Sequence, residues 1–85
     1  MFETDVNYEA GNGVVSWIVA PDSSAIAGFG YQKEKRVLTV DFKGGRRRYD
    51  YHDVPEAVFE GMKAAPSKGV FFAENIRDVY RYARV

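Results

Sequence analysis

Residues 36–52 read RVLTVDFKGGRRRYDYH, and this stretch decides the fold. Polar and apolar residues alternate before the glycine pair, so that Leu38, Val40 and Phe42 share one face, as in a half-buried strand. The two glycines supply a two-residue hairpin loop, because a residue without Cβ adopts positive φ at little cost. The stretch therefore predicts a β-hairpin with one apolar and one charged face.

The return strand of this hairpin carries aromatic residues. A tight loop places Val40 opposite Tyr49 and Leu38 opposite Tyr51. We therefore expect both tyrosines in the core, with their hydroxyls at a polar edge, rather than on a platform that stacks RNA bases. If bases stack on this protein, the aromatic residues expected to hold them are Trp17, Phe29 and Tyr31.

The pattern after the hairpin changes to helical spacing. Asp53 is a candidate cap, Pro55 suits the first turn, and Glu56 completes a capping box. This helix must stop near Pro66. Its apolar stripe is Val54, Val58, Met62 and Ala65.

A second helix is expected after its N-cap at Ser67. Its apolar positions recur at spacings of four, three and four, and they are Phe72, Ile76, Val79 and Ala83. Both helices are expected to cover the apolar face of the hairpin, because a sheet with one apolar face must bury it.

The first part of the chain adds strands to the hairpin. An apolar run over residues 25–31 predicts a strand that completes an antiparallel meander. Residues 1–22 form an N-terminal extension, with Trp17 packed on the body and room for one extra strand. The predicted fold is α+β: an antiparallel three-stranded β-meander, with that fourth N-terminal strand in addition, followed by two α-helices packed on one face. Residues 23–85 are expected to form a single domain.

Composition excludes several classes of function. The 85 residues include no cysteine and a single histidine, so disulfides, thiolate zinc sites and a structural metal are not expected. The acidic N-terminus is unlike a signal peptide, and no apolar run is long enough to span a membrane. A cytoplasmic protein without metal or cofactor is expected.

Charge is distributed unevenly along the chain. Twelve basic and twelve acidic residues give a net charge of zero. Residues 1–32 nevertheless carry four acids and no base, whereas residues 33–48 carry seven bases against two acids. The balance therefore hides a basic central segment.

A series of short motifs runs through residues 23–82. They are Ser23-Ser24, Gly30-Tyr31, residues 37–40 with Phe42 and Gly45, Tyr49-x-Tyr51, Val54-Pro55, residues 65–69, Phe72, Ile76-Arg77 and Tyr80-x-Tyr82. In this order they resemble the KTSC domain, a short bacterial domain found alone and at the C-terminus of some lysyl-tRNA synthetases. Ala73 departs from the pattern, since family members often carry Asn there. The family has no known function, and its attachment to a synthetase implies RNA binding by association.

The candidate binding site combines cations on the charged face of the hairpin with a helix N-terminus. Its residues are Lys43, Arg46, Arg48, Ser67, Lys68 and Arg77. The predicted partner is RNA, held through its phosphates. A protein partner, docked on the N-terminal extension or on an exposed sheet edge, is the alternative.

Most of these residues also have a structural interpretation. Arg48 lies opposite Asp41 in the inferred register, Ser67 suits an ordinary N-cap, and Arg77 can pair with Glu74 three residues earlier. Lysines and arginines on a hairpin also discourage edge pairing. The sequence leaves both interpretations open.

Catalysis is the least favoured class of function. A small ribonuclease-type enzyme would rely on His52, the only histidine. Its neighbour Asp53 would project from the opposite face of a strand, so the pair is not poised to act together. No catalytic residue is assigned.

Overall fold

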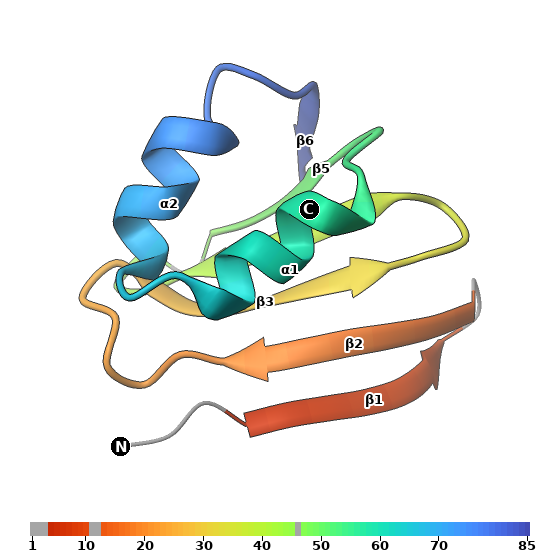
Figure 1. Ribbon diagram of the computed structural model, residues 1–85, viewed down its shortest axis with the longest axis horizontal. Helices are drawn as coiled ribbons and strands as arrows, with labels where there is room; N and C mark the ends of the chain where they lie inside the picture. Colours follow the sequence, from red (N-terminus) through yellow and green to blue (C-terminus); the bar gives the residue numbers. More distant parts are fainter. Residues whose placement is uncertain (1–3, 11–12, 46) are drawn as a thin grey trace.

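A six-stranded antiparallel sheet carries two helices on one face (Figure 1). The computed structural model describes the backbone of residues 4–10, 13–45 and 47–85, and the side chains of residues 16–45 and 47–85. The elements, in chain order, are β1 (Thr4–Ala10), β2 (Gly13–Val19), β3 (Ile26–Gln32), β4 (Val37–Phe42), β5 (Arg48–Tyr51), α1 (Glu56–Ala64), α2 (Lys68–Asn75) and β6 (Tyr82–Arg84). The predicted α+β class, a meander followed by two helices, is confirmed.

The central hairpin has the register that its sequence predicts. Val40 pairs with Tyr49, and Leu38 pairs with Tyr51. The loop between β4 and β5 contains Gly44 at φ +81°, a conformation that glycine adopts without strain. Because side chains alternate across a strand, this register fixes which residues face the helices.

Strands are added at both ends of this meander. The N-terminal extension forms two strands rather than one: β1 pairs with β2, and β2 pairs with β3. At the other edge, β6 pairs with β5, so that Tyr82 lies opposite Tyr51. The strand order β1-β2-β3-β4-β5-β6 therefore follows the chain.

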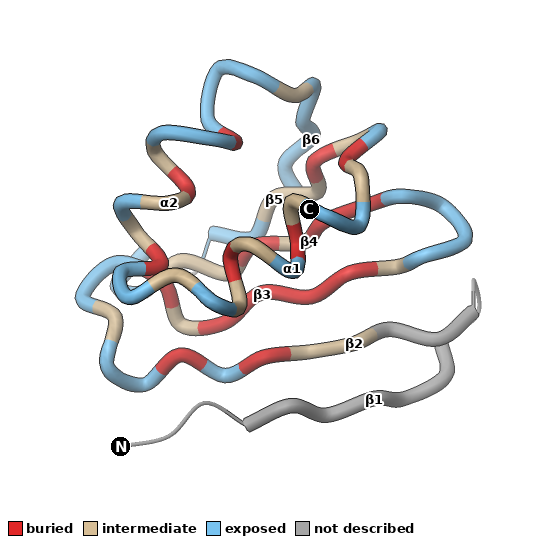
Figure 2. Tube along the Cα trace, in the orientation of Figure 1, coloured by how far each residue is buried: buried red, intermediate tan, exposed pale blue. Residues whose placement is uncertain are grey.

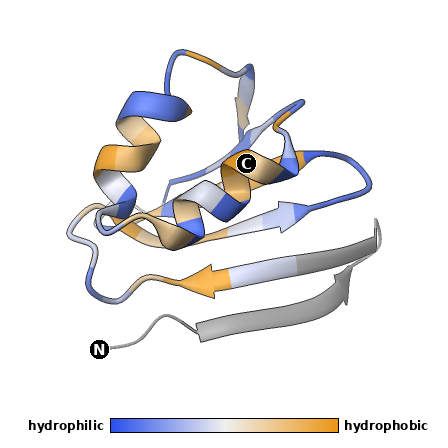
Figure 3. Ribbon diagram, in the orientation of Figure 1, coloured by the Kyte–Doolittle hydropathy of each residue, from blue (hydrophilic) through white to orange (hydrophobic). Residues whose placement is uncertain are grey.

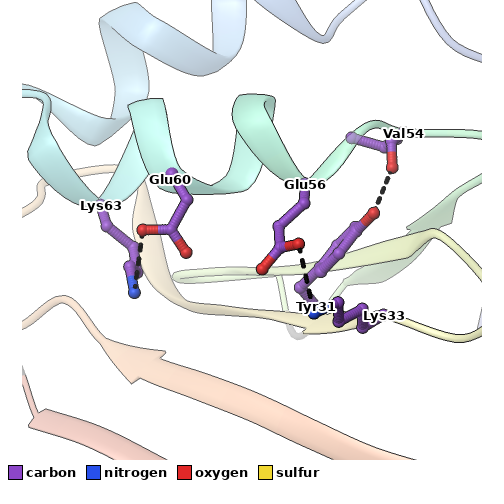
Figure 4. Close-up of polar contacts among 6 residues, drawn as sticks. All are labelled: Tyr31, Lys33, Val54, Glu56, Glu60 and Lys63. Atoms are coloured by element: carbon purple, nitrogen blue, oxygen red, sulfur yellow. Dashed lines mark hydrogen bonds and ion pairs between the residues drawn. The ribbon is translucent and has the colours of Figure 1, made fainter.

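Helix α1 packs over β3 and closes one half of the core (Figure 2). The ring of Phe59 lies edge-on to Phe29, with centroids 5.8 Å apart, and stacks on Tyr31 at 5.2 Å. The Tyr31 hydroxyl donates to the carbonyl of Val54 at 2.5 Å, which ties the start of the helix to β3 (Figure 4). Phe59 is missing from the predicted stripe, whereas the predicted Val58 is only half-buried. The buried face of α1 is thus rotated from the expected one.

The predicted capping box at the start of α1 is wrong. The N-cap is Pro55, and no side chain caps the helix. Asp53 instead adopts a left-handed conformation, with φ 58°, and pairs with Arg81 at 3.4 Å. The Asp53 carboxylate is therefore directed to Arg81 and not to the amides of the first helical turn.

Helix α2 starts where the sequence predicts and ends earlier. Ser67 is the N-cap, and its hydroxyl accepts from the amide of Val70 at 3.3 Å. Ile76 is buried as expected, but the helix ends at Asn75, so that Val79 is 61% exposed and Ala83 lies in β6. The prediction of one helix through Ala83 is therefore wrong.

A short strand replaces the expected end of this helix. Asp78 has φ 64°, which turns the chain back toward the sheet. The amide of His52 then donates to Arg81 O, and the amide of Val85 donates to Arg48 O. These hydrogen bonds satisfy backbone groups that a longer helix would have satisfied internally. Figure 3 shows hydrophilic residues in the turn between β3 and β4 and at the end of α2, and hydrophobic residues along parts of both helices.

Trp17 packs on the face of the sheet that the helices leave open. Its ring lies against Gly28 and Gly30 of β3, where a Cβ on either glycine would approach it closely. At Gly30 the added methyl would overlap the ring and lie 3.1 Å from the carbonyl oxygen of Ser16. The two glycines therefore make the flat surface that accepts the indole.

Replacing Gly30 by alanine should lower the free energy of unfolding by about 1 to 3 kcal/mol, because the ring of Trp17 must move away from the strand. The matched control is Gly69→Ala in α2, where the nearest atom to an added Cβ is Ala25 Cβ at 3.7 Å. That change should stabilise the protein by up to about 1 kcal/mol, since alanine favours helix. Urea denaturation of both variants measures the difference, and equal midpoints would contradict this packing.

Lys68 joins the two helices. Its side chain is buried at 9% exposure, and its ammonium donates to Lys63 O at 2.9 Å and to Ala65 O at 2.6 Å. Those carbonyls lie at the C-terminal end of α1, where helical carbonyls lack partners within the helix. The lysine therefore caps the preceding helix.

Lys68→Met keeps the aliphatic stem but removes both donors, so it should lower the free energy of unfolding by about 1 to 3 kcal/mol. Lys35→Met removes an exposed lysine in the turn between β3 and β4 and should change stability by less than about 0.5 kcal/mol. Thermal or urea unfolding checks the pair. Equal stability of the two variants would argue against the capping role.

Candidate functional site

A pocket opens between the end of α2 and the strands β4, β5 and β6. It has a volume of about 500 Å³ and is walled by aromatic rings, with charged side chains around them. The aromatic residues are Phe42, Tyr49, Tyr51, Phe72 and Tyr82, and the charged ones are Lys43, Arg47, Arg77 and Asp78. We call this site the tyrosine pocket.

Three tyrosines of neighbouring strands form one wall of the tyrosine pocket. The ring of Tyr82 lies 5.5 Å from Tyr49 and 5.6 Å from Tyr51, measured between centroids. Tyr51 is buried in the core, Tyr49 is half-buried beside it, and Tyr82 is 58% exposed at the rim. The register had placed Tyr49 and Tyr51 on the helix-facing side, and the structure shows that the core-facing rings also border the pocket.

Phe72 of α2 lines the tyrosine pocket and packs against two of its other aromatic rings. Its ring meets Phe42 edge-on at 5.2 Å and Tyr51 edge-on at 5.5 Å. Burial, followed by the neighbouring Tyr49 and Tyr82, raises the pKa of Tyr51 to about 12. The Tyr51 phenol therefore keeps its proton at neutral pH.

The charged residues of the tyrosine pocket are mostly basic. The Lys43 ammonium donates to Pro21 O at 3.1 Å and also to Ser23 O, which fixes it at the edge of the pocket. Arg47 and Arg77 are exposed, as is Asp78. Three cations against one carboxylate give this part of a neutral protein a positive local charge.

The residues predicted from the sequence to form one site do not lie together. Lys43 and Arg77 line the tyrosine pocket. Arg48 lies on the open face of the sheet, where it pairs with Asp41 at 3.5 Å and covers the ring of Trp17 at 5.3 Å. Arg46 is outside the residues that the structure describes.

The other two predicted residues lie at the connection between the helices. Ser67 caps α2, and the buried ammonium of Lys68 caps α1. The N-cap at Ser67 is the structural interpretation that the sequence offered, whereas the capping of α1 by Lys68 was not predicted.

Arg47 lines the pocket but was not among the predicted residues. Strict alternation placed it opposite Phe42 on the apolar face, and its carbonyl does accept from the amide of Phe42 at 2.9 Å. Alternation thus places the Arg47 side chain on the same side of the sheet as Tyr49 and Tyr51, where the pocket lies, and this is the signal that could have identified it.

The aromatic residues that the sequence suggested for base stacking do not line the tyrosine pocket. Phe29 and Tyr31 are buried beneath α1, and Trp17 lies on the opposite face of the sheet. In the part of the chain that the structure describes, no three potential metal ligands gather. No helix within those residues is long and apolar enough to cross a membrane.

Known proteins resemble this chain in sequence and in fold. A family model for the KTSC domain matches residues 22–82. The chain is 32% identical over 68 residues to a lysine–tRNA ligase from Nostoc punctiforme, a match that covers 80% of this chain and 12% of that protein. It is 35% identical over 68 residues to an uncharacterized protein from Stutzerimonas stutzeri, covering 79% of this chain and 94% of that one.

A solved structure has the same architecture. The crystal structure of a KTSC domain protein from Yersinia pestis superposes with a TM-score of 0.77 at 28% sequence identity, covering 84% of this chain and 97% of that chain. The chain thus spans only a small part of the ligase that it matches and nearly all of the smaller relatives. Since the family model covers most of the chain and the fold agrees with a solved member, this protein belongs to the KTSC domain family.

Proposed function

We propose that this protein is a non-catalytic module that binds single-stranded RNA at the tyrosine pocket. The observation that carries the proposal is the combination, in one open cavity, of exposed aromatic surface with three cations. Proteins that hold single strands use this pairing: the cations follow the phosphates and the rings stack on bases. Stacking does not require one particular base, because every base has a π-face.

The cations are arranged so that a phosphate can approach without disturbing the fold. An ammonium carries three N–H donors. Two of the Lys43 donors are directed at the carbonyls of Pro21 and Ser23, which leaves one N–H for a ligand in the pocket that Lys43 lines. Arg47 and Arg77 add planar guanidinium groups, which suit phosphate oxygens in a bidentate manner.

The relatives support RNA as the partner. One of them is named as a lysine–tRNA ligase, and its match to this chain is only 12% of its length. A module of this size attached to an enzyme that acts on tRNA is suited to holding RNA. The association alone does not identify a ligand, and the pocket supplies the physical reason.

Catalysis has little support from the pocket. His52, the only histidine of the chain, does not line it. A general acid or base must reach the reacting atoms within hydrogen-bond distance. Binding without catalysis is therefore the function that the geometry supports.

An NMR titration of the full chain with a short mixed-sequence single-stranded RNA tests the proposal. Binding should weaken with salt, with a slope of log K against log salt of about −2 for three phosphate contacts, because each contact on a single strand contributes roughly −0.7. Arg77→Ala should make the slope shallower by roughly 0.7 and weaken binding at low salt. Amide shifts should cluster at Lys43, Tyr49 and Tyr82.

Arg81→Ala is the matched control for Arg77→Ala. Arg81 is an exposed arginine of the same segment that pairs with Asp53 and does not line the pocket, so its loss should leave RNA binding unchanged. Shifts confined to Trp17 and Arg48 would move the site to the open face of the sheet and refute the proposed one. Absence of shifts at low salt would refute RNA binding and favour the alternative, a protein partner.

A further inference from the structure

Tyr51 is the one buried side chain of the tyrosine pocket that presents an unused polar group. Its side chain is 5% exposed, and its contacts in the structure are ring contacts with Tyr49, Phe72 and Tyr82. Among the described residues, its hydroxyl has no hydrogen-bond partner, yet no side-chain nitrogen or oxygen there is both fully buried and unsatisfied. The hydroxyl must therefore reach solvent.

The hydroxyl reaches solvent through the tyrosine pocket. The groups that act electrostatically on the Tyr51 phenol are Tyr49, Tyr82, Arg77 and Asp78, and all four line that cavity. Burial keeps the pKa of Tyr51 high, so the hydroxyl stays protonated and can both donate and accept a hydrogen bond at neutral pH. The Tyr51 hydroxyl is thus a protonated polar group within an aromatic cavity.

We propose that the tyrosine pocket receives the base of one unpaired nucleotide, and that the Tyr51 hydroxyl forms a hydrogen bond with the edge of that base. This inference rests on the proposed function and adds to it a specificity-determining residue. The ligand class is a nucleoside monophosphate unit of RNA, with its phosphate toward Arg77 and its base against the tyrosine rings.

The dimensions of the cavity agree with this occupant. A volume of about 500 Å³ lies inside the roughly 300 to 1,000 Å³ that is typical of small-molecule sites. Tyr82, 58% exposed at the rim, offers a ring on which a flat base can stack, while Tyr51 lies deeper. A base that stacks on the pocket side of the Tyr82 ring can direct its edge toward the Tyr51 hydroxyl.

Chemistry at the base edge can then discriminate among bases. Every base presents donors and acceptors at its edges, which proteins read in unpaired RNA. A site with a polar group to satisfy disfavours a ligand that leaves the group unpaired. The phosphate contacts, by contrast, are the same for every nucleotide. Affinity should thus come from Arg77 and the rings, and base preference from Tyr51.

The test uses the full chain and measures dissociation constants for the four nucleoside 5′-monophosphates and for inorganic phosphate by NMR titration. At least one mononucleotide should bind roughly tenfold more tightly than inorganic phosphate, since base–aromatic stacking contributes on the order of a tenfold gain or more. Tyr51→Phe should reduce the difference between the best and the worst base by roughly three- to tenfold. Its affinity for inorganic phosphate should not change.

The matched control is Tyr80→Phe, which makes the same chemical change at a half-buried tyrosine that does not line the pocket. It should retain the base preference of the unaltered protein. Tyr51→Phe is expected to fold, because the lost hydroxyl has no partner in the described protein, and amide spectra of both variants verify this directly.

Two results would overturn the inference while leaving the proposed function standing. One is RNA binding at the pocket together with mononucleotides that bind no tighter than inorganic phosphate. The other is a Tyr51→Phe protein whose base preference is intact. Failure of RNA itself to bind at low salt would instead refute the proposed function, and the inference with it.

Discussion

The structure depends on contact between one phenylalanine of each helix and the aromatic rings of the sheet. Phe59 secures α1 on Phe29 and Tyr31, and Phe72 secures α2 on Tyr51. In a chain of 85 residues the core is small, so each fully buried aromatic ring, worth roughly 2 to 3 kcal/mol, is a large share of the total stability. Tyr51 takes part in this core and also borders the pocket. The candidate binding surface is therefore built partly on the packed core, which favours precise placement of a ligand.

The pocket exists because α2 ends at Asn75. The left-handed turn at Asp78 returns the chain to the sheet, and β6 then pairs with β5. This pairing brings Tyr82 beside Tyr49 and Tyr51 and supplies the exposed rim of the pocket. A helix continued to Ala83 would have carried that segment away from β5. The feature that sequence spacing predicted wrongly is thus the one that creates the candidate site.

The sequence predicts the central hairpin well because two independent signals agree there. Alternation assigns the faces, and the glycine loop sets the register, so that Val40 and Tyr49 pair as expected. The end of α2 was not predictable in the same way, since the spacing of Val79 and Ala83 fits a helix and neither glycine nor proline follows Asn75. The pairing of β6 with β5 determines where this helix ends. The same holds for the candidate site. Basic residues are easy to find in a sequence, but whether Lys68 faces a ligand or caps a helix depends on how the chain turns between α1 and α2, which brings the carbonyls of Lys63 and Ala65 to the ammonium.

The strand order also explains how the extension and the pocket coexist. The family match begins at residue 22, so β1 and β2 lie outside it. Without them, β3 would be an edge strand with unpaired amides and a row of buried apolar residues, a template for unwanted pairing. The β1–β2 hairpin pairs with that edge, whereas the pocket is built from β4, β5 and β6 toward the opposite edge. The loop after β2 nevertheless reaches the pocket, because Lys43 holds the carbonyls of Pro21 and Ser23. Lys43 therefore lines the pocket and also connects it to the extension, so that the extension can protect one edge of the sheet without covering the pocket near the other.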